Sequence, residues 1–495
     1  TRVPMKKSTK RLLPRLLKAL LLLVLGGLIT VVVVGIALVN SKQDLKIWHV
    51  AELDAEFSTE SGIRTFEEYL ALEDELFRQL DERVYDRISP ADKVASNRYH
   101  RGSLADPANC ERNWNRSFEL AGDPADRSRP AVLLLHGLSD SPYSLRSIGQ
   151  RLHDQGAHVL GLRIPGHGTA PSVLTETTWQ DMAAAVEIAV RHLQGRAAGR
   201  PFYIVGYSNG GALAVHYALS AIERPELHMP DGLVLISPEI GITPMAAMAI
   251  WQERAGRLLG LDKLNWTGIA PEYDPYKYTS FPANAGNLAH ALTRWNRKKI
   301  SQLGSAAKLD SFPPTLAFQS ILDATITASS LVRDLFDWLP ANGHELVIFD
   351  LNRNIEIEAL LKSDPGRGAF ELLDSPDRSF TLTLLTNATA SSEDLVARTW
   401  GIGQTAPTQS ETGLRWPPGV FSLTHVALPF PDDDPVYGGK PQGMGPGIQI
   451  GIVAARGEKG ALQIPAQDML RLRWNPFHPY LSERLKAHLG IAARR

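Results

Sequence analysis

The sequence has few of the features that support a disulfide scaffold, a metal centre or a nucleic-acid surface. Its one cysteine, Cys110, has no intramolecular partner, and we interpret it as a buried structural thiol. It contains no HExxH motif, cysteine cluster, phosphate-binding P-loop or strand-borne GxGxxG. Its net charge is −1, whereas nucleic-acid binders carry a basic excess. We therefore predict no metal, no cofactor and no nucleic-acid partner.

The composition is that of a folded globular protein. Hydrophobic residues make up 44% and charged residues 21%, a balance that argues against a disordered chain. With 495 residues and no evident internal repeat, the chain exceeds one ordinary domain. We expect a core domain that carries large insertions or a second module.

The N-terminal segment is strongly asymmetric in charge. Residues 1–18 are rich in Lys and Arg, no acidic residue precedes Asp44, and residues 19–39 carry no charge. As a helix, this uncharged run would be about 31 Å long, enough to cross a bilayer. We predict a basic cytoplasmic segment, then an uncleaved transmembrane signal-anchor, with the remainder exported and periplasmic in a Gram-negative source. A cleaved signal peptide and a buried helix are the alternatives.

The region after this segment is predicted to connect it to the main domain. Within residues 40–115, the stretch 65–88 places apolar side chains at three- and four-residue spacing, which indicates an amphipathic helix. Polar and proline-containing loops follow. We predict that the main domain covers 116–495.

Short apolar runs then alternate with helical stretches. Strands are predicted at 131–136, 157–163, 202–207, 232–237, 315–321 and 344–350, with helices at 145–156, 178–193 and 210–219. This alternation predicts an α/β fold with a mostly parallel sheet, whose functional residues follow the carboxyl ends of the strands. The alternation is interrupted by an apolar, helical insertion after Pro238 and by a second insertion at about 354–418.

The clearest motif is Gly-Tyr-Ser-Asn-Gly at 206–210, which matches G-x-S-x-G. It lies between a predicted strand and a predicted helix, where a strained turn would expose a serine nucleophile and the flanking glycines would avoid a clash. We therefore predict Ser208 as the nucleophile.

An oxyanion hole is predicted beside this serine. His136 and Gly137 end the first central strand, and the loop after them offers the backbone N–H of Leu138. The N–H of Asn209 would be the second donor, at the start of the next helix. We expect His136 to orient its loop rather than to transfer protons.

Three motifs together give a family resemblance: LLLHG, RIPGHGTAPS at 163–172, and GYSNGG. They resemble the α/β-hydrolase superfamily, and most closely its branch of monoacylglycerol lipases, carboxylesterases and serine aminopeptidases. The similarity covers about 130–340. It implies a helical cap at about 240–310, a structural role for His167, and the chain order serine, acid, histidine.

The acid and the histidine follow from that order. The resemblance implies Asp323, in the loop after strand 315–321, as the acid, with Asp350 as the alternative. The base must lie on a late loop within reach of the serine and be oriented by the acid. His425 follows a strand-like run and is our prediction, with His478 as its rival, whereas His344 falls at the wrong end of a strand.

These residues predict a membrane-anchored serine hydrolase that cleaves acyl or lipid esters through an acyl-enzyme. The alternative within enzymes is an aminopeptidase, in which Glu239 or Glu272 would bind the amine. A non-catalytic, membrane-tethered binding protein on a degenerate hydrolase fold is the alternative outside enzymes. A haloalkane dehalogenase is disfavoured because its nucleophile is aspartate. The acidic run 432–434 is interpreted as a solvated turn.

Overall fold

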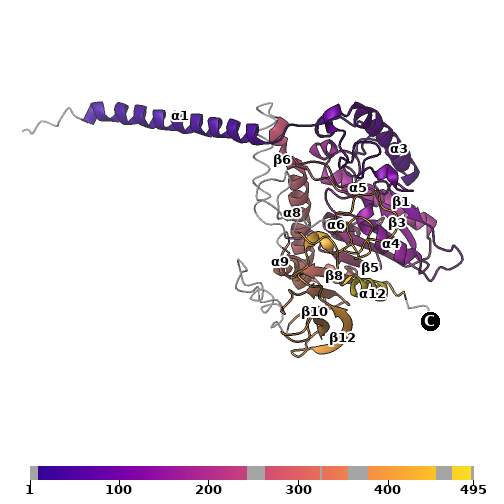
Figure 1. Cartoon of the computed structure of the whole chain (residues 1–495). Coiled ribbons are helices and arrows are strands. Elements are labelled where there is room, and N and C mark those ends of the chain that lie inside the picture. The colour runs from indigo at the N-terminus through magenta and orange to yellow at the C-terminus, as the bar shows by residue number, and fades with distance from the viewer. Residues whose placement is uncertain (1–8, 242–261, 324–325, 355–376, 453–470, 492–495) are drawn as a thin grey trace, which may run out of the picture.

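A ten-stranded sheet forms the centre of the protein (Figure 1). The structure, a computed structural model, describes residues 9–241, 262–323, 326–354, 377–452 and 471–491. The strand order across the sheet is β1-β3-β2-β4-β5-β8-β9-β10-β11-β12. Neighbours from β3 to β10 run parallel, and the pairs β1–β3, β10–β11 and β11–β12 are antiparallel. The predicted α/β class with a mostly parallel sheet is confirmed.

The predicted strands all occur, with ends shifted by at most one residue. They are β2 (Ala131–Leu135), β3 (His158–Leu162), β4 (Phe202–Tyr207), β5 (Gly232–Ile236), β8 (Thr315–Ser320) and β9 (Glu345–Phe349). Apolar residues fill them because both faces of a parallel sheet are covered by helices. The edge strand β1 (Phe118–Leu120) was not predicted.

Helices cover the two faces of the sheet. Leu133 and Leu135 of β2 join the core formed with α5 (Trp179–Arg196), α6 (Asn209–Glu223) and α8 (Ala283–Ser305). The alternate residues Val132 and Leu134 join the opposite core, with α4 (Arg146–His153) and α12 (His478–His488). This alternation follows from the two-residue period of a strand.

The N-terminal region, predicted as a helical connecting region over 40–115, packs into the folded body. It contains α2 (Ile47–Val50) and α3 (Phe66–Arg83). Phe57, Phe66 and Tyr69 are buried in the same core as the central strands. The spacing of apolar residues predicted the helix α3. That spacing does not show which surface the apolar face of the helix covers.

The two predicted insertions differ in structure. Of the predicted cap, residues 242–261 lie outside the described residues. The rest forms the short pair β6 (Trp266–Gly268) and β7 (Phe281–Pro282), followed by α8, which packs against α6. The second insertion, where it is described, extends the sheet by β10 (Thr381–Asn387), β11 (Asp394–Trp400) and β12 (Thr408–Arg415).

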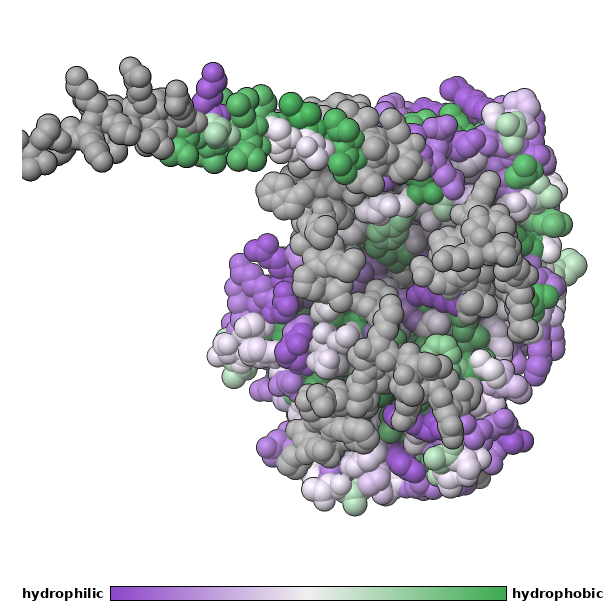
Figure 2. All heavy atoms as spheres, turned by 60° about the vertical axis from the view of Figure 1, so that its left-hand side comes forward, coloured by the Kyte–Doolittle hydropathy of each residue, from purple (hydrophilic) through white to green (hydrophobic). Residues whose placement is uncertain are grey.

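The helix α1 (Thr9–Ser41) projects from the body as a long rod (Figure 1). Many of its Leu and Val side chains are exposed, and Figure 2 shows the apolar residues along the rod. None of the helices in the described parts of the chain has the length and apolarity needed to cross a membrane. The predicted transmembrane helix is therefore not supported.

Candidate active site

Ser208 lies on a sharp turn between β4 and α6. Its backbone has φ 53° and ψ −117°, a region that non-glycine residues rarely occupy. The turn is tight because a Cβ on Gly206 would overlap the Gly210 carbonyl, and one on Gly210 would overlap that of Leu135. The two flanking glycines therefore permit the strained serine, as the motif predicted.

His425 lies between Ser208 and Asp323. The Oγ of Ser208 is 2.9 Å from Nε2 of His425, and Nδ1 of His425 is 2.8 Å from Oδ2 of Asp323. With the Nδ1–H tautomer, Nδ1 donates to the carboxylate and Nε2 accepts from the serine hydroxyl. The structure thus brings together the three residues predicted from the sequence, and all three are buried.

Asp323 is held by neighbours on its own side of the sheet. It follows β8, and its carboxylate accepts hydrogen bonds from Nε2 of Gln319 at 2.9 Å and from the Ile326 amide at 3.1 Å. Because β4 and β8 are both part of the parallel array, their carboxyl ends lie at the same edge. Ser208 and Asp323 therefore meet at this edge, and His425 lies between them.

The rival residues have other partners. His478 begins α12, is buried, and contacts Oγ of Ser482 at 3.3 Å. Burial lowers its pKa to about 3. The carboxylate of Asp350 accepts from the Thr386 hydroxyl at 2.7 Å and pairs with Arg353 at 2.9 Å.

The predicted oxyanion loop lines the same cavity as Ser208. Leu138 lies in the cavity wall, and Asn209 directly follows Ser208 as the first residue of α6. Ser139, next in the loop, has φ 62°, and its carbonyl accepts from the Tyr278 amide at 2.8 Å. A second strained residue therefore lies beside the predicted hole.

His136 supports this loop as expected. One ring nitrogen, Nδ1, donates to the Gly137 carbonyl at 2.9 Å, and the other accepts from the Ile164 amide at 3.0 Å. Burial holds the pKa of His136 well below its ordinary value, so the ring stays neutral. Its neighbour His167 is also buried, with Nδ1 2.9 Å from the Pro165 carbonyl.

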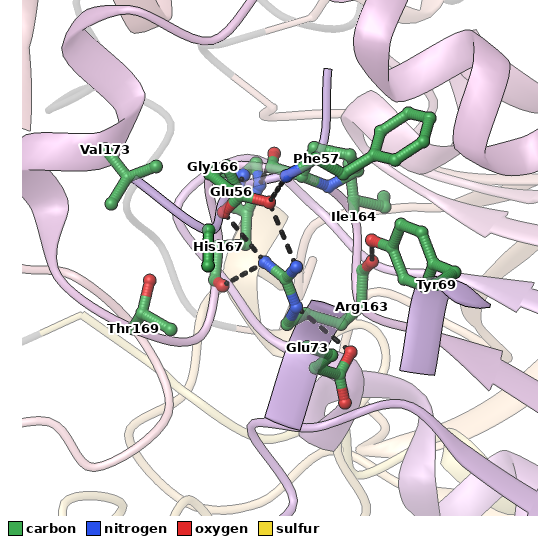
Figure 3. A network of polar contacts seen from close by, with 12 residues as sticks. Glu56, Phe57, Tyr69, Glu73, Arg163, Ile164, Gly166, His167, Thr169 and Val173 are labelled. Atoms are coloured by element: carbon green, nitrogen blue, oxygen red, sulfur yellow. Dashed lines mark hydrogen bonds and ion pairs between the residues drawn. The ribbon is translucent and has the colours of Figure 1, made fainter. Parts of the chain in front are cut away.

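A buried ion-pair network holds the neighbouring segment, residues 163–167 (Figure 3). The guanidinium of Arg163 is 3.0 Å from Glu56 and 3.0 Å from Glu73, and it also donates to the His167 carbonyl at 3.1 Å. Both glutamates come from the N-terminal region. Sequence reasoning missed this network, because no local spacing links partners about a hundred residues apart in the chain.

The cavity at Ser208 has a volume of about 370 Å³. Its ionisable lining residues are Asp140, Glu239, Asp274, Lys277, Arg471 and Arg473, together with His425. Lys277 pairs with Asp140 at 2.8 Å, and the hydroxyl of Tyr437 donates to Asp274. The wall therefore combines aromatic and charged side chains around the serine.

The other residues of interest have structural partners. Among the described residues, no group of three or more His, Cys, Asp or Glu is arranged to hold a metal ion. Asp434 is not in a solvated turn: it is buried and accepts from the Tyr143 hydroxyl at 2.9 Å. Cys110 is only partly buried, with Sγ 3.1 Å from the Tyr276 hydroxyl.

The fold, the serine turn and the order of the site residues define an α/β-hydrolase. Residues 126–330 match the sequence profile of the serine aminopeptidase family. This match and the relatives below show that the hydrolase region is similar to monoacylglycerol lipases and serine aminopeptidase-like proteins, and they support a serine hydrolase of the lipase and esterase kind.

Individual relatives are similar over part of the chain. A thermostable monoacylglycerol lipase from a Bacillus species is 31% identical over 125 residues, which is 25% of this chain and 46% of the relative. A putative 2-succinyl-6-hydroxy-2,4-cyclohexadiene-1-carboxylate synthase from Haemophilus influenzae is 30% identical over 112 residues, 22% of this chain and 42% of the relative. The matches thus span less than half of these curated relatives.

Solved structures show a more distant likeness. The monoacylglycerol lipase of Paleococcus ferrophilus is 18% identical and has a TM-score of 0.35, covering 47% of this chain and 88% of that chain. A monoglyceride lipase variant from Saccharomyces cerevisiae is 16% identical with a TM-score of 0.37, covering 47% and 82%.

Proposed function

We propose that the protein hydrolyses carboxylic esters of acyl or lipid type through an acyl-enzyme on Ser208. The observation that carries this proposal is the pair of contacts made by His425, 2.9 Å to the Ser208 hydroxyl and 2.8 Å to the Asp323 carboxylate. A serine is a weak nucleophile until a base removes its proton, and a base in this position, oriented by an acid, meets that need.

The reaction would proceed in two halves. His425 takes the proton of Ser208 as the hydroxyl oxygen attacks the ester carbonyl, and Asp323 stabilises the imidazolium that forms. The backbone amides of Leu138 and Asn209 hold the negative charge on the carbonyl oxygen. The imidazolium then protonates the leaving alcohol, which leaves an acyl-enzyme. Water, activated by His425, attacks the acyl group and releases the acid and Ser208.

A fluorophosphonate probe tests this proposal, because it phosphonylates only an activated serine. We expect the full chain to be labelled, Ser208→Ala to abolish the labelling, and His425→Ala to reduce it strongly. His478→Ala and Ser220→Ala, a buried serine of α6, are the controls and keep the label. A folded protein that takes up no label would contradict the proposal and favour the non-catalytic alternative.

We further propose that α1 holds the hydrolase at a membrane. The support is the set of exposed leucine, isoleucine and valine side chains on α1, among them Leu20, Leu23 and Val33 at 60%, 73% and 59% exposure. Such a surface is costly in water. The basic residues before this run favour a cytoplasmic N-terminus and an exported body, periplasmic in a Gram-negative source.

Membrane fractionation tests this attachment. We expect the full chain to sediment with membranes and a variant lacking residues 9–41 to stay in the supernatant. An alkaline carbonate wash separates two forms of attachment: release indicates a helix lying at the surface, and retention indicates an inserted one. A full chain that stays in the supernatant would contradict the proposal.

A further inference from the structure

The segment between β6 and β7 contacts the predicted oxyanion loop at three consecutive residues. The ammonium group of Lys277 is 2.8 Å from Oδ1 of Asp140 and donates to the Leu138 carbonyl at 3.4 Å. The amide of Tyr278 donates to the Ser139 carbonyl, between those two residues, at 2.8 Å. Two adjacent residues therefore hold both the backbone and one side chain of the oxyanion loop.

The contact between Lys277 and Asp140 bears on the direction of the Leu138 N–H. The amide of Asp140 donates to the Gly137 carbonyl at 3.2 Å, and Nδ1 of His136 donates to the same carbonyl at 2.9 Å. The Gly137 carbonyl and the Leu138 N–H belong to one peptide unit, which is planar and trans. Fixing the carbonyl therefore fixes the N–H in the opposite direction, and the residue that holds Asp140 helps to aim this donor.

The oxyanion loop needs this support because it is strained and closely packed. Ser139 has a positive φ of 62°. A Cβ on Gly137 would lie 2.7 Å from Oδ2 of Asp140 and 2.9 Å from Cε1 of Tyr207, so the Asp140 side chain packs directly over the glycine. Asp140 is only 5% exposed, and a buried carboxylate is costly without an opposite charge. Lys277 provides that charge.

Lys277 is placed by a turn that the fold holds on two sides. Oδ1 of Asp274 accepts the amides of Tyr276 at 3.0 Å and of Lys277 at 3.1 Å. The same oxygen accepts the Tyr437 hydroxyl. The ring of Tyr276 stacks on that of Tyr143, with the centroids 3.8 Å apart. The ammonium group therefore extends from a fixed backbone.

Glu272, considered above as an amine-binding residue, also holds this segment. It is 2% exposed, and its two oxygens accept the backbone amides of Thr279 at 3.1 Å and Ser280 at 2.8 Å. It is not among the residues that line the cavity at Ser208. Its carboxyl group is thus used by the fold, where it fixes the chain that follows Lys277.

Lys299 forms a similar ion pair away from the site. Its ammonium group is 2.8 Å from Oε2 of Glu223, and its side chain is 20% exposed, against 24% for Lys277. That pair joins α8 to the last residue of α6, at the opposite end of the helix from Ser208. The two lysines are matched in contact distance and exposure, but only Lys277 contacts the oxyanion loop.

We propose that Lys277 is a positioning residue: through its ion pair with Asp140, it keeps the Leu138 N–H aimed at the oxygen of the ester carbonyl. This inference rests on the ester hydrolysis proposed above. The carbonyl oxygen carries its full negative charge only in the tetrahedral species, so loss of the ion pair should lower kcat and leave KM nearly unchanged. Lys277 acts through the loop and touches no reacting atom.

Kinetics of the full chain with p-nitrophenyl butyrate test this role. We expect Lys277→Met to lower kcat by about tenfold or more at a similar KM, because a misplaced donor stabilises the oxyanion poorly. Asp140→Ala should have a comparable effect. The double variant should be no slower than the slower single variant, because both changes break one contact. Lys299→Met, the matched control, should keep the wild-type kcat.

A trifluoromethyl ketone separates the oxyanion hole from general damage to the fold. Ser208 adds to the carbonyl of 1,1,1-trifluorodecan-2-one, and the ketone oxygen becomes an anion like that of the tetrahedral species. We expect its Ki to rise in Lys277→Met by about the factor by which kcat/KM falls. Circular dichroism checks that each variant is folded.

Four results would overturn the inference. The first is an unchanged kcat in Lys277→Met. The second is a loss confined to KM, which would place Lys277 on the substrate. The third is an undiminished kcat in Asp140→Ala beside a slow Lys277→Met, which would mean that the ammonium charge acts on the oxyanion directly. The fourth is a Ki that does not rise.

End-point labelling of the wild-type chain by a fluorophosphonate shows separately whether the serine is active. A chain without label removes the proposed hydrolysis and this inference with it. A labelled chain that gives one of the four results above removes only the role of Lys277.

Discussion

Ser208 and His425 lie on two loops whose shapes are held in different ways. The serine turn is built from adjacent residues: β4 leads into it, α6 leads out of it, and Gly206 and Gly210 give it room. Every part of this turn lies within a short stretch of chain. The strain at Ser208 is therefore fixed by local structure and by the close contact of the two glycines with their neighbours.

The loop that carries His425 depends on distant parts of the chain. The Ser320 hydroxyl donates to the Leu423 carbonyl at 2.9 Å, and the Thr424 hydroxyl donates to the Leu472 carbonyl at 2.6 Å. Asp323 then fixes the imidazole itself. Local geometry thus positions the nucleophile, Ser208, whereas long-range contacts position the base, His425. We therefore expect a single substitution to disrupt the whole serine turn. The loss of one contact should weaken the histidine loop only in part.

The largest expected effect comes from separating the base from its acid. In Asp323→Asn, the histidine loses the partner that selects its Nδ1–H tautomer, and we expect kcat to fall about 10⁴-fold. Asp350→Asn is the matched control, because that acid binds Arg353 and Thr386 instead. Ester hydrolysis and circular dichroism measure the two variants. A comparable loss of kcat in both would contradict the assignment of the acid.

The serine turn should not tolerate a single added methyl group. In Gly210→Ala, the new Cβ would overlap the Leu135 carbonyl, so we expect a loss of about 3 kcal/mol in the free energy of unfolding, together with loss of activity. Gly195→Ala, in α5, meets no atom within 4 Å and should gain about 0.5 kcal/mol. Urea unfolding compares them. If Gly210→Ala were as stable as wild type, the turn would be less tight than described.

Glu239, beside the serine turn, makes the free energy of unfolding depend on pH. Because burial raises its pKa from 4.5 to about 7, the unfolded chain loses this proton in that window while the folded protein keeps it. The contribution of Glu239 to wild-type stability therefore falls by about 3 kcal/mol as pH rises through this range. Glu239→Gln stays neutral, so its stability relative to wild type should rise by that amount between pH 4.5 and 8. Urea unfolding at both pH values measures it, and a pH-independent difference would contradict the raised pKa.

The smallest effect concerns the histidine loop. Ser320→Ala removes the hydroxyl that holds Leu423, two residues before His425, and we expect a cost of about 1 kcal/mol and a several-fold fall in kcat. Thr424→Val, which removes the other tether, should act in the same direction. Kinetics at saturating substrate measure both variants. An undiminished kcat in both would mean that Asp323 alone positions the base.

The sequence predicted those parts of the fold that neighbouring residues determine. The central strands and Ser208 follow from apolar runs and from one motif whose glycines have a local steric role. The choice of Asp323 and His425 required the family's chain order, because β10, β11 and β12 separate the two residues in sequence. Once β10 continues the sheet, the loop after β12 can return to the edge where β8 ends.

The remaining features depend on contacts that no local pattern encodes. The N-terminal region packs into the core through Phe57 and Tyr69, and Arg163 is paired with two acids from that region. Asp434, expected in a solvated turn, is buried by Tyr143 and its neighbours. The sequence of an acidic run does not show whether the run lies in solvent or in a core. The residues that pack against it determine whether it is buried.

The most direct test of the account is a double-mutant cycle on Ser208 and His425, with kcat for ester hydrolysis as the readout and folding checked by circular dichroism. Residues that act as one catalytic unit are strongly non-additive. We therefore predict that Ser208→Ala and His425→Ala each reduce kcat by several orders of magnitude and that the double variant is no slower than either. Losses that multiply in the double variant, or a His425→Ala enzyme that keeps kcat close to wild type, would contradict the proposed serine–histidine pair.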